Sequence, residues 1–377
     1  MSSPTSSPQL PAPRVVLVLA GAAGEIGETA TALERARMPQ LGALVAAGRV
    51  GRLRTVASHL PVNDTTAAAA LLGTVPPVHL DPGAVASEAL GGLLAADESC
   101  TLVEVVDLLG DPAPALDVQR AIDAMHHQLS WHRIVGVRNG HQVLVAGAAE
   151  PRLPEIDGLH LRPAEHGLLP QRQLDHGTVV VADEGSTLLG VASLLGARCE
   201  AVDPTRAERH DPVPARLRER AIASLLAGAR TVVVETRAPI QARRGLRERS
   251  LRDRTLRECL EHLDRELIGP LRSASAWTGS CLSVTADMPR TLLGEPVRGE
   301  VPLVISGPRA VLVTGHAPMA PPPGSSLPPR HCERALVDAP IVTSPFAVVP
   351  ERDTAAPRRF RRDPVTGGTT VDELIPG

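Results

Sequence analysis

The side chains in this sequence that most clearly suggest a chemical role are arginines. The segment 243–254 reads RRGLRERSLRDR. A fixed pair such as Arg243 and Arg244 offers positive charge and paired donors that suit the oxygens of a phosphate or carboxylate. A charged loop that only faces solvent has the same appearance, so both interpretations stay open. The chain contains no Lys, which excludes a Schiff-base lysine and a P-loop lysine.

Proton transfer and nucleophilic attack have candidates near one turn, HLPVND, at 59–64. His59 stands at the start of this turn and is the candidate general base for hydroxyl chemistry. Asp64 ends the turn, and Thr65 follows it with a hydroxyl group. Histidines in loops are common, so the sequence alone does not assign this role to His59.

Composition narrows the class of protein. The chain has 377 residues, 43% hydrophobic and 21% charged, the balance of a folded protein with a large core. The apolar runs are too short to cross a membrane, and the N-terminus lacks the pattern of a secretory signal. Two Phe, two Trp and a net charge of −3 give no basis for binding nucleic acid. Five scattered Cys indicate a reducing, cytoplasmic setting without disulfides.

Short apolar runs alternate with helical segments, which predicts a mostly parallel α/β sheet with helices on both faces. RVVLVLAG at 14–21 is typical of a buried strand, and TTAAAALLG at 65–73 of a helix that Asp64 can cap. The segment 115–147 instead predicts a helix and a hairpin around the turn RNG, as in a small α+β domain inserted into the larger sheet. We therefore expect a disordered tail at 1–13, core at 14–77, an inserted cap at 78–176, core at 177–320 and a partly ordered, Pro- and Arg-rich segment at 321–377.

The order of several segments resembles the alkaline phosphatase superfamily, and within it the archaeal-type cofactor-independent phosphoglycerate mutases. MPQLGALVAAGRVG at 38–51 is similar to the superfamily's TPNLDxLAxxGxxG, and LPVNDTTAAAALLGTVPP at 60–77 to its nucleophile segment. WHRIVGVRNGHQVLVAG at 131–147 is similar to the mutases' RxxxGVxYRHLLV hairpin. Counterparts continue in the same order to about residue 308, so the resemblance implies the fold of that family.

The resemblance also implies two divalent metals and a Ser nucleophile, and this sequence departs from both. The nucleophile position falls on Asn63 or Asp64, depending on a one-residue gap. The first metal-binding carboxylate is replaced by Ala20, and the family's TGDH reads TADM, which retains Asp287. We expect no catalytic metal pair and no cofactor.

Two further replacements change the chemistry of the positions that hold metal in the family. The family's APDExGH reads APIQARR at 238–244, so Ile240 stands for Asp and Arg244 for His. Arginine can supply the positive charge that a metal would otherwise supply. Arg138 matches the place where the inserted domain of the mutases contacts the substrate's phosphate or carboxylate. The expected site therefore combines Asp64, Thr65 and His59 as catalytic candidates with Arg243, Arg244, Arg138 and Asp287 as ligand-binding candidates.

Three functions remain open from the sequence. The first is a repurposed, metal-independent enzyme or binding protein for an anionic small molecule, as in specialised metabolism, with its site between core and cap. The second is a non-catalytic pseudoenzyme that acts through a protein partner. The third is residual metal-dependent phosphomutase or phosphohydrolase activity through a shifted hydroxyl.

Overall fold

The computed structural model describes residues 12–23, 35–56, 60–74, 80–92, 94, 98–138, 140–164, 167, 174, 177–203, 213–243, 248–290, 296–307, 341–342, 361–362 and 369–370. Within these ranges no helix is long and apolar enough to span a membrane.

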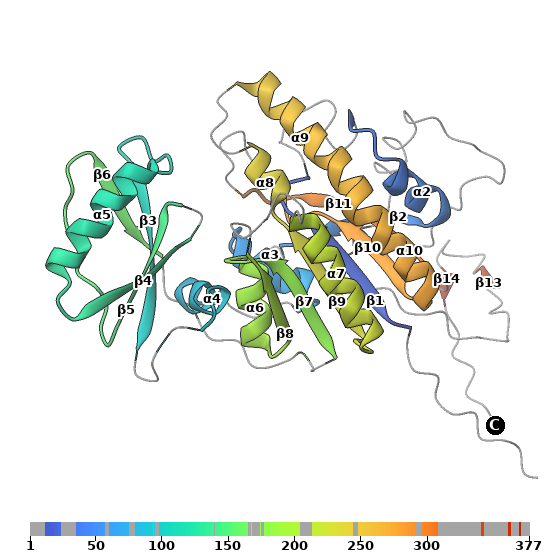
Figure 1. Ribbon diagram of the computed structural model, residues 1–377, viewed down its shortest axis with the longest axis horizontal. Coiled ribbons are helices and arrows are strands. Elements are labelled where there is room, and N and C mark those ends of the chain that lie inside the picture. The colour runs from blue at the N-terminus through green and yellow to red at the C-terminus, as the bar shows by residue number, and fades with distance from the viewer. Residues whose placement is uncertain are drawn as a thin grey trace, which may run out of the picture.

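An eight-stranded sheet organises the larger part of the molecule (Figure 1). Its order is β12-β2-β11-β10-β1-β9-β7-β8, and β10, β1, β9, β7 and β8 run parallel. β11 is antiparallel to both of its neighbours. The strands are β1 (Arg14–Leu19), β2 (Arg49–Arg54), β7 (Thr178–Asp183), β8 (Arg198–Val202), β9 (Thr231–Thr236), β10 (Cys281–Thr285), β11 (Glu300–Ser306) and β12 (Ile341–Val342).

The central strands are parallel because helices cover them on both faces. Every residue of β7 and β10 is buried, as the continuous apolar runs predict. The crossover from β7 through α6 (Thr187–Leu195) leads outward to β8, and the crossover through α7 (Val213–Leu226) leads back to β9. Since such crossovers are right-handed, α6 and α7 lie on opposite faces. The predicted fold class is confirmed.

The remaining helices of this part pack beside those two. α2 (Pro39–Ala47) and α10 (Gly269–Thr278) contact each other, and α10 also contacts α7; α3 (Asp64–Leu71) contacts α6. α8 (Ala238–Arg243) packs on α9 (Arg249–Leu263).

α9 continues through a π-helical turn η1 (Asp264–Ile268) directly into α10. The fully buried Asp264 of this turn accepts the N–H groups of Gln40 and Leu41, both at 2.9 Å. Its carboxylate thereby caps α2, whose preceding residue, Met38, makes no side-chain cap.

A second, four-stranded antiparallel sheet has the order β4-β5-β3-β6 and stands apart from the first in Figure 1. It comprises β3 (Ser99–Asp107), β4 (His132–Arg138), β5 (Gln142–Gly147) and β6 (Leu159–Pro163). α5 (Ala115–Gln128) covers one face through Val118, Ala121 and Met125. The predicted helix and hairpin are present, and β3 and β6 are additional strands. The proposed boundaries of the inserted domain stay a prediction.

α4 (Pro82–Ala89) joins the two parts and packs against both α6 and β3. Two glycines permit this close approach. A Cβ on Gly190 of α6 would lie 1.9 Å from the carbonyl oxygen of Val85, and a Cβ on Gly83 would lie 1.7 Å from that of Cys100. Backbone therefore meets backbone on two sides of α4.

Candidate functional site

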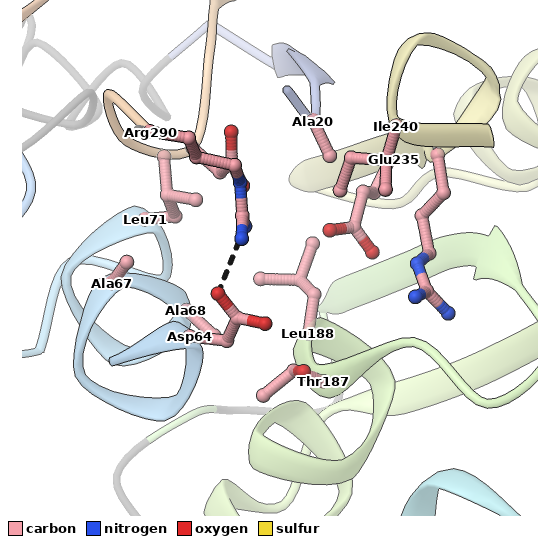
Figure 2. Close-up of a pocket in the computed structure, with 12 residues that line it drawn as sticks. Ala20, Asp64, Ala67, Ala68, Leu71, Thr187, Leu188, Glu235, Ile240 and Arg290 are labelled. Carbon is pink, nitrogen blue, oxygen red and sulfur yellow. Dashed lines mark hydrogen bonds and ion pairs between the residues drawn. The ribbon is translucent and has the colours of Figure 1, made fainter. Parts of the chain in front are cut away.

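A pocket lies where the carboxyl ends of β1, β9 and β10 meet the N-terminus of α3 (Figure 2). Ligands of open α/β sheets commonly bind at this edge. Its lining combines apolar side chains with three carboxylates and two guanidinium groups. The lining residues are Ala20, Asp64, Ala67, Ala68, Leu71, Thr187, Leu188, Glu235, Arg237, Ile240, Asp287 and Arg290.

Asp64 enters the pocket as the first residue of α3, and this corrects the prediction that it caps the helix. The cap is Asn63, which has an extended backbone and accepts the N–H of Thr66 at 2.8 Å. A capping side chain must turn back onto its own helix. With Asn63 in that role, the carboxylate of Asp64 is directed into the pocket, in the first turn where a negative charge is favoured.

Arg290 joins the two carboxylates that the sequence proposed for the site. Its Nη2 donates to Oδ1 of Asp64 at 2.9 Å and to Oδ2 of Asp287 at 2.6 Å. Asp287 also accepts the N–H of Gly21 at 2.7 Å, directly after β1. The guanidinium therefore joins the start of α3 to Asp287 after β10, and Asp287 is in turn bonded to the end of β1.

Burial and the neighbouring charges shift the pKa of Arg290 in opposite directions. Burial alone would lower the pKa of Arg290, but the carboxylates of Asp64 and Asp287 outweigh it and raise that pKa above its ordinary value. The guanidinium is therefore always charged. The side chain of Asp287 is only 10% exposed and that of Asp64 41%, so the pair with Asp287 is the more strongly desolvated of the two.

Glu235 is the third lining carboxylate, near the end of β9. It is 7% exposed and accepts a short hydrogen bond on Oε2 from the hydroxyl of Ser186, the N-cap of α6. Burial raises the pKa of Glu235 to about 7, against the lowering effects of the Ser186 hydrogen bond and the charge of Arg237. The charges of Asp287 and Asp183 act in the same direction as burial, and a carboxyl with a pKa of about 7 is suited to proton transfer near neutral pH.

Asp183 lies behind Glu235, at the end of the neighbouring strand β7. Its Oδ2 accepts the N–H of Arg237 at 2.7 Å, whereas its buried Oδ1 has no hydrogen-bond partner among the described residues. Burial raises the pKa of Asp183, and the hydrogen bond and charge of Arg237 lower it.

The divalent metal pair implied by the family resemblance does not fit this donor set. Ala20 and Ile240 contribute only hydrocarbon to the lining, and Met288 is buried against Val56 and Ala67. Two of the three lining carboxylates, Asp64 and Asp287, accept from the guanidinium of Arg290, and the third, Glu235, accepts from the hydroxyl of Ser186. In the described part of the chain, no three His, Cys, Asp or Glu side chains are arranged to hold a metal ion.

Five other residues were proposed for the site from the sequence: Thr65, Arg138, Arg243, His59 and Arg244. Thr65 is buried next to Asp64, and it is not among the described residues that line the pocket. Arg138 ends β4 in the second sheet, and Arg243 ends α8. His59 and Arg244 lie outside the described residues. The roles of these residues stay predictions.

Sequence reasoning missed Arg290, Arg237 and Glu235. A signal existed for Glu235, because an acidic residue within the apolar strand TVVVET is costly unless it has a function or a partner. Arg290 stands three residues after Asp287, but nothing in that spacing indicates that it reaches Asp64.

Solved structures share this fold. The PH0037 protein from Pyrococcus horikoshii is similar with a TM-score of 0.59 and 17% identity, over 80% of this chain and 89% of that one. A cofactor-independent phosphoglycerate mutase from Thermoplasma acidophilum DSM 1728 has a TM-score of 0.44 and 17% identity, over 78% of this chain and 90% of that one. A protein in the alkaline phosphatase superfamily from Vibrio parahaemolyticus has a TM-score of 0.38 and 11% identity, over 79% of this chain and 61% of that one.

The resemblance predicted from the sequence is confirmed as a likeness of fold. At 17% identity, the likeness to the PH0037 protein shows the fold alone. No protein-family model and no curated protein matches the chain.

Proposed function

We propose that this chain is a metal-independent descendant of the phosphoglycerate mutase-like fold, and that its pocket binds or acts on a small molecule bearing a phosphate or carboxylate. One observation carries the proposal: a single guanidinium, that of Arg290, donates to both Asp64 and Asp287 at the carboxyl edge of the sheet. The guanidinium of Arg290 supplies the positive charge that a metal would otherwise bring.

The lining supports a small organic anion. Arg237 and Arg290 supply positive charge, whereas Ala20, Leu71 and Ile240 supply apolar contact for a carbon skeleton. Arg138, Arg243 and Arg244 remain proposed as further anion-binding groups. A cytoplasmic location is proposed on the scattered Cys residues alone.

A protein partner is the second candidate. Leu108, Leu109 and Leu116 are 66%, 89% and 77% exposed, close together in sequence between the end of β3 and the start of α5. Large exposed apolar side chains in one region are typical of docking surfaces.

Calorimetric titration and thermal unfolding with sulfate, phosphate, manganese and magnesium test the first proposal. We expect sulfate and phosphate to bind and raise the melting temperature, and the metals to bind at less than one per chain. Arg290→Gln should weaken sulfate binding at least tenfold. Arg120→Gln is the control, because Arg120 pairs with Asp117 on α5 far from the pocket.

Two results would contradict the proposal. Two manganese ions per chain, with a stabilising shift, would favour the metal-dependent phosphomutase or phosphohydrolase instead. The absence of any response to anions would favour the protein-partner function instead.

A further inference from the structure

When all the acidic side chains that line the pocket are ionised, the net charge of the lining opposes the binding of an anion. Asp64, Asp287 and Glu235 carry three negative charges, and Arg237 and Arg290 carry two positive ones. An anion entering this pocket would meet net negative charge in a partly desolvated space, where repulsion is strong. Removing one of the three negative charges makes the lining neutral. The question is therefore which carboxyl becomes protonated.

Asp64 and Asp287 are poor candidates. Both are already occupied as acceptors of hydrogen bonds from the permanently charged Arg290. Glu235 has no such bond from a guanidinium among the described residues. Its surroundings include two acids, Asp183 on β7 and Asp287 after β10, and one base, Arg237 after β9.

The hydrogen bonds around Ser186 decide which oxygen of Glu235 would carry the proton. Ser186 is fully buried, and its hydroxyl oxygen accepts the N–H of Leu188 at 3.0 Å. Its single hydroxyl proton goes to Oε2 of Glu235, the acceptor present among the described residues. Oε2 is therefore held as an acceptor, which leaves Oε1 for the proton. Figure 2 shows this carboxyl beside Leu188 and Ala20, on the far side of the pocket from Arg290.

We propose that Glu235 is the proton-carrying group of the pocket, and that it binds an anionic ligand as a neutral carboxylic acid whose Oε1–H donates to a ligand oxygen. The inference rests on the proposed anion-binding function. In the binding step the free protein takes up one proton from solvent at Glu235 as the anion enters. No covalent bond of the ligand is formed or broken.

The pKa of about 7 supports this assignment, because the proton is then available near neutral pH at small cost. Asp183, with Oδ1 buried and unpartnered within the described structure, keeps a second acid close behind Glu235. Ionisation of both at once is unfavourable, as for other paired carboxyls.

Proton uptake measured by calorimetry tests the proposal directly. Sulfate is the probe, because its charge does not change near neutral pH. Titrations at about pH 8, one unit above the pKa of Glu235, in buffers with different ionisation enthalpies give the protons taken up per sulfate. We expect close to one for the natural chain.

Glu235→Gln should remove this uptake while it preserves shape and hydrogen bonding to Ser186. Because glutamine is always neutral, sulfate should bind about tenfold more tightly at this pH than to the natural chain, in which only about a tenth of Glu235 is protonated. Glu184→Gln, an exposed residue one position beyond β7, is the matched control and should leave both the uptake and the affinity unchanged.

Ser186→Ala provides a second variant should Glu235→Gln fold poorly. The Ser186 hydrogen bond lowers the pKa of Glu235, so its loss should move the midpoint of sulfate affinity against pH upward.

Sulfate binding without proton uptake, or uptake that persists in Glu235→Gln, would overturn the inference and leave anion binding intact. Failure of sulfate to bind at about pH 6, where Glu235 is mostly neutral, would overturn the proposed function as well.

Discussion

Asp64 and Arg290 are 226 positions apart in the sequence, and 2.9 Å separates Oδ1 of the first from Nη2 of the second. The same Nη2 reaches Asp287 at 2.6 Å. The guanidinium thus fixes the start of α3 against the end of β10, and it does so with a charge that no change of pH near neutrality removes.

Arg290→Gln should lower the free energy of unfolding by about 3 kcal/mol, because it leaves the buried carboxylate of Asp287 without its charged partner. Urea unfolding followed by circular dichroism measures this change. The double variant Asp287→Asn/Arg290→Gln removes both charges and should recover at least half of the loss. A double variant as unstable as the sum of the two single ones would show that the residues do not interact.

Glu235→Gln should change how stability depends on pH. The pKa of Glu235 is about 7 in the folded chain, above the ordinary 4.5. The folded state therefore binds more protons in this window, and the stability of the natural chain should fall as pH rises from about 4.5 to about 7, by up to about 3 kcal/mol. Unfolding curves of both proteins across this range measure it. Parallel stability profiles would show that Glu235 has an ordinary pKa.

Gly190→Ala should destabilise the contact between α6 and α4 by about 1–3 kcal/mol, because the added methyl group would meet the carbonyl oxygen of Val85. Gly42→Ala is the matched control: Gly42 lies within α2, and its Cβ would meet nothing within 4 Å. That substitution should stabilise the chain by about 0.5–1 kcal/mol. Equal effects at the two positions in denaturant unfolding would contradict the close approach.

Asp264→Ala should cost about 3 kcal/mol in the free energy of unfolding, since two N–H groups of α2 lose a buried charged acceptor. The comparison is Asp253→Ala, which removes a partly exposed pair with Arg35 and should cost less than about 1 kcal/mol. Hydrogen exchange at Gln40 and Leu41 should accelerate only in the first variant. Unchanged exchange at these two amides would argue against the cap.

Helices and strands could be predicted where the local sequence pattern agrees with the burial of the segment in the folded chain. β1, β9 and β10 are apolar runs that become buried strands, and the hairpin of β4 and β5 follows from its turn. β6 was not predicted because only two residues of LHLRP are apolar. Its hydrogen-bonded pairing with β3, rather than its own sequence pattern, makes this segment a strand. The cap of α3 was misplaced by one residue, since Asn63 and Asp64 are both good capping residues and only the backbone conformation distinguishes them.

By itself, the sequence determined the fold class and the order of the elements, which follow from apolar periodicity along the chain. Asp64 and Asp287 were proposed for the site through the family resemblance, and the structure places both in the lining of the pocket. The tertiary structure alone decided that Arg290 joins these two carboxylates, that Ser186 holds Glu235, and that Glu235 has a pKa of about 7. Contacts between distant segments, and the burial that shifts a pKa, exist only after the strands align side by side.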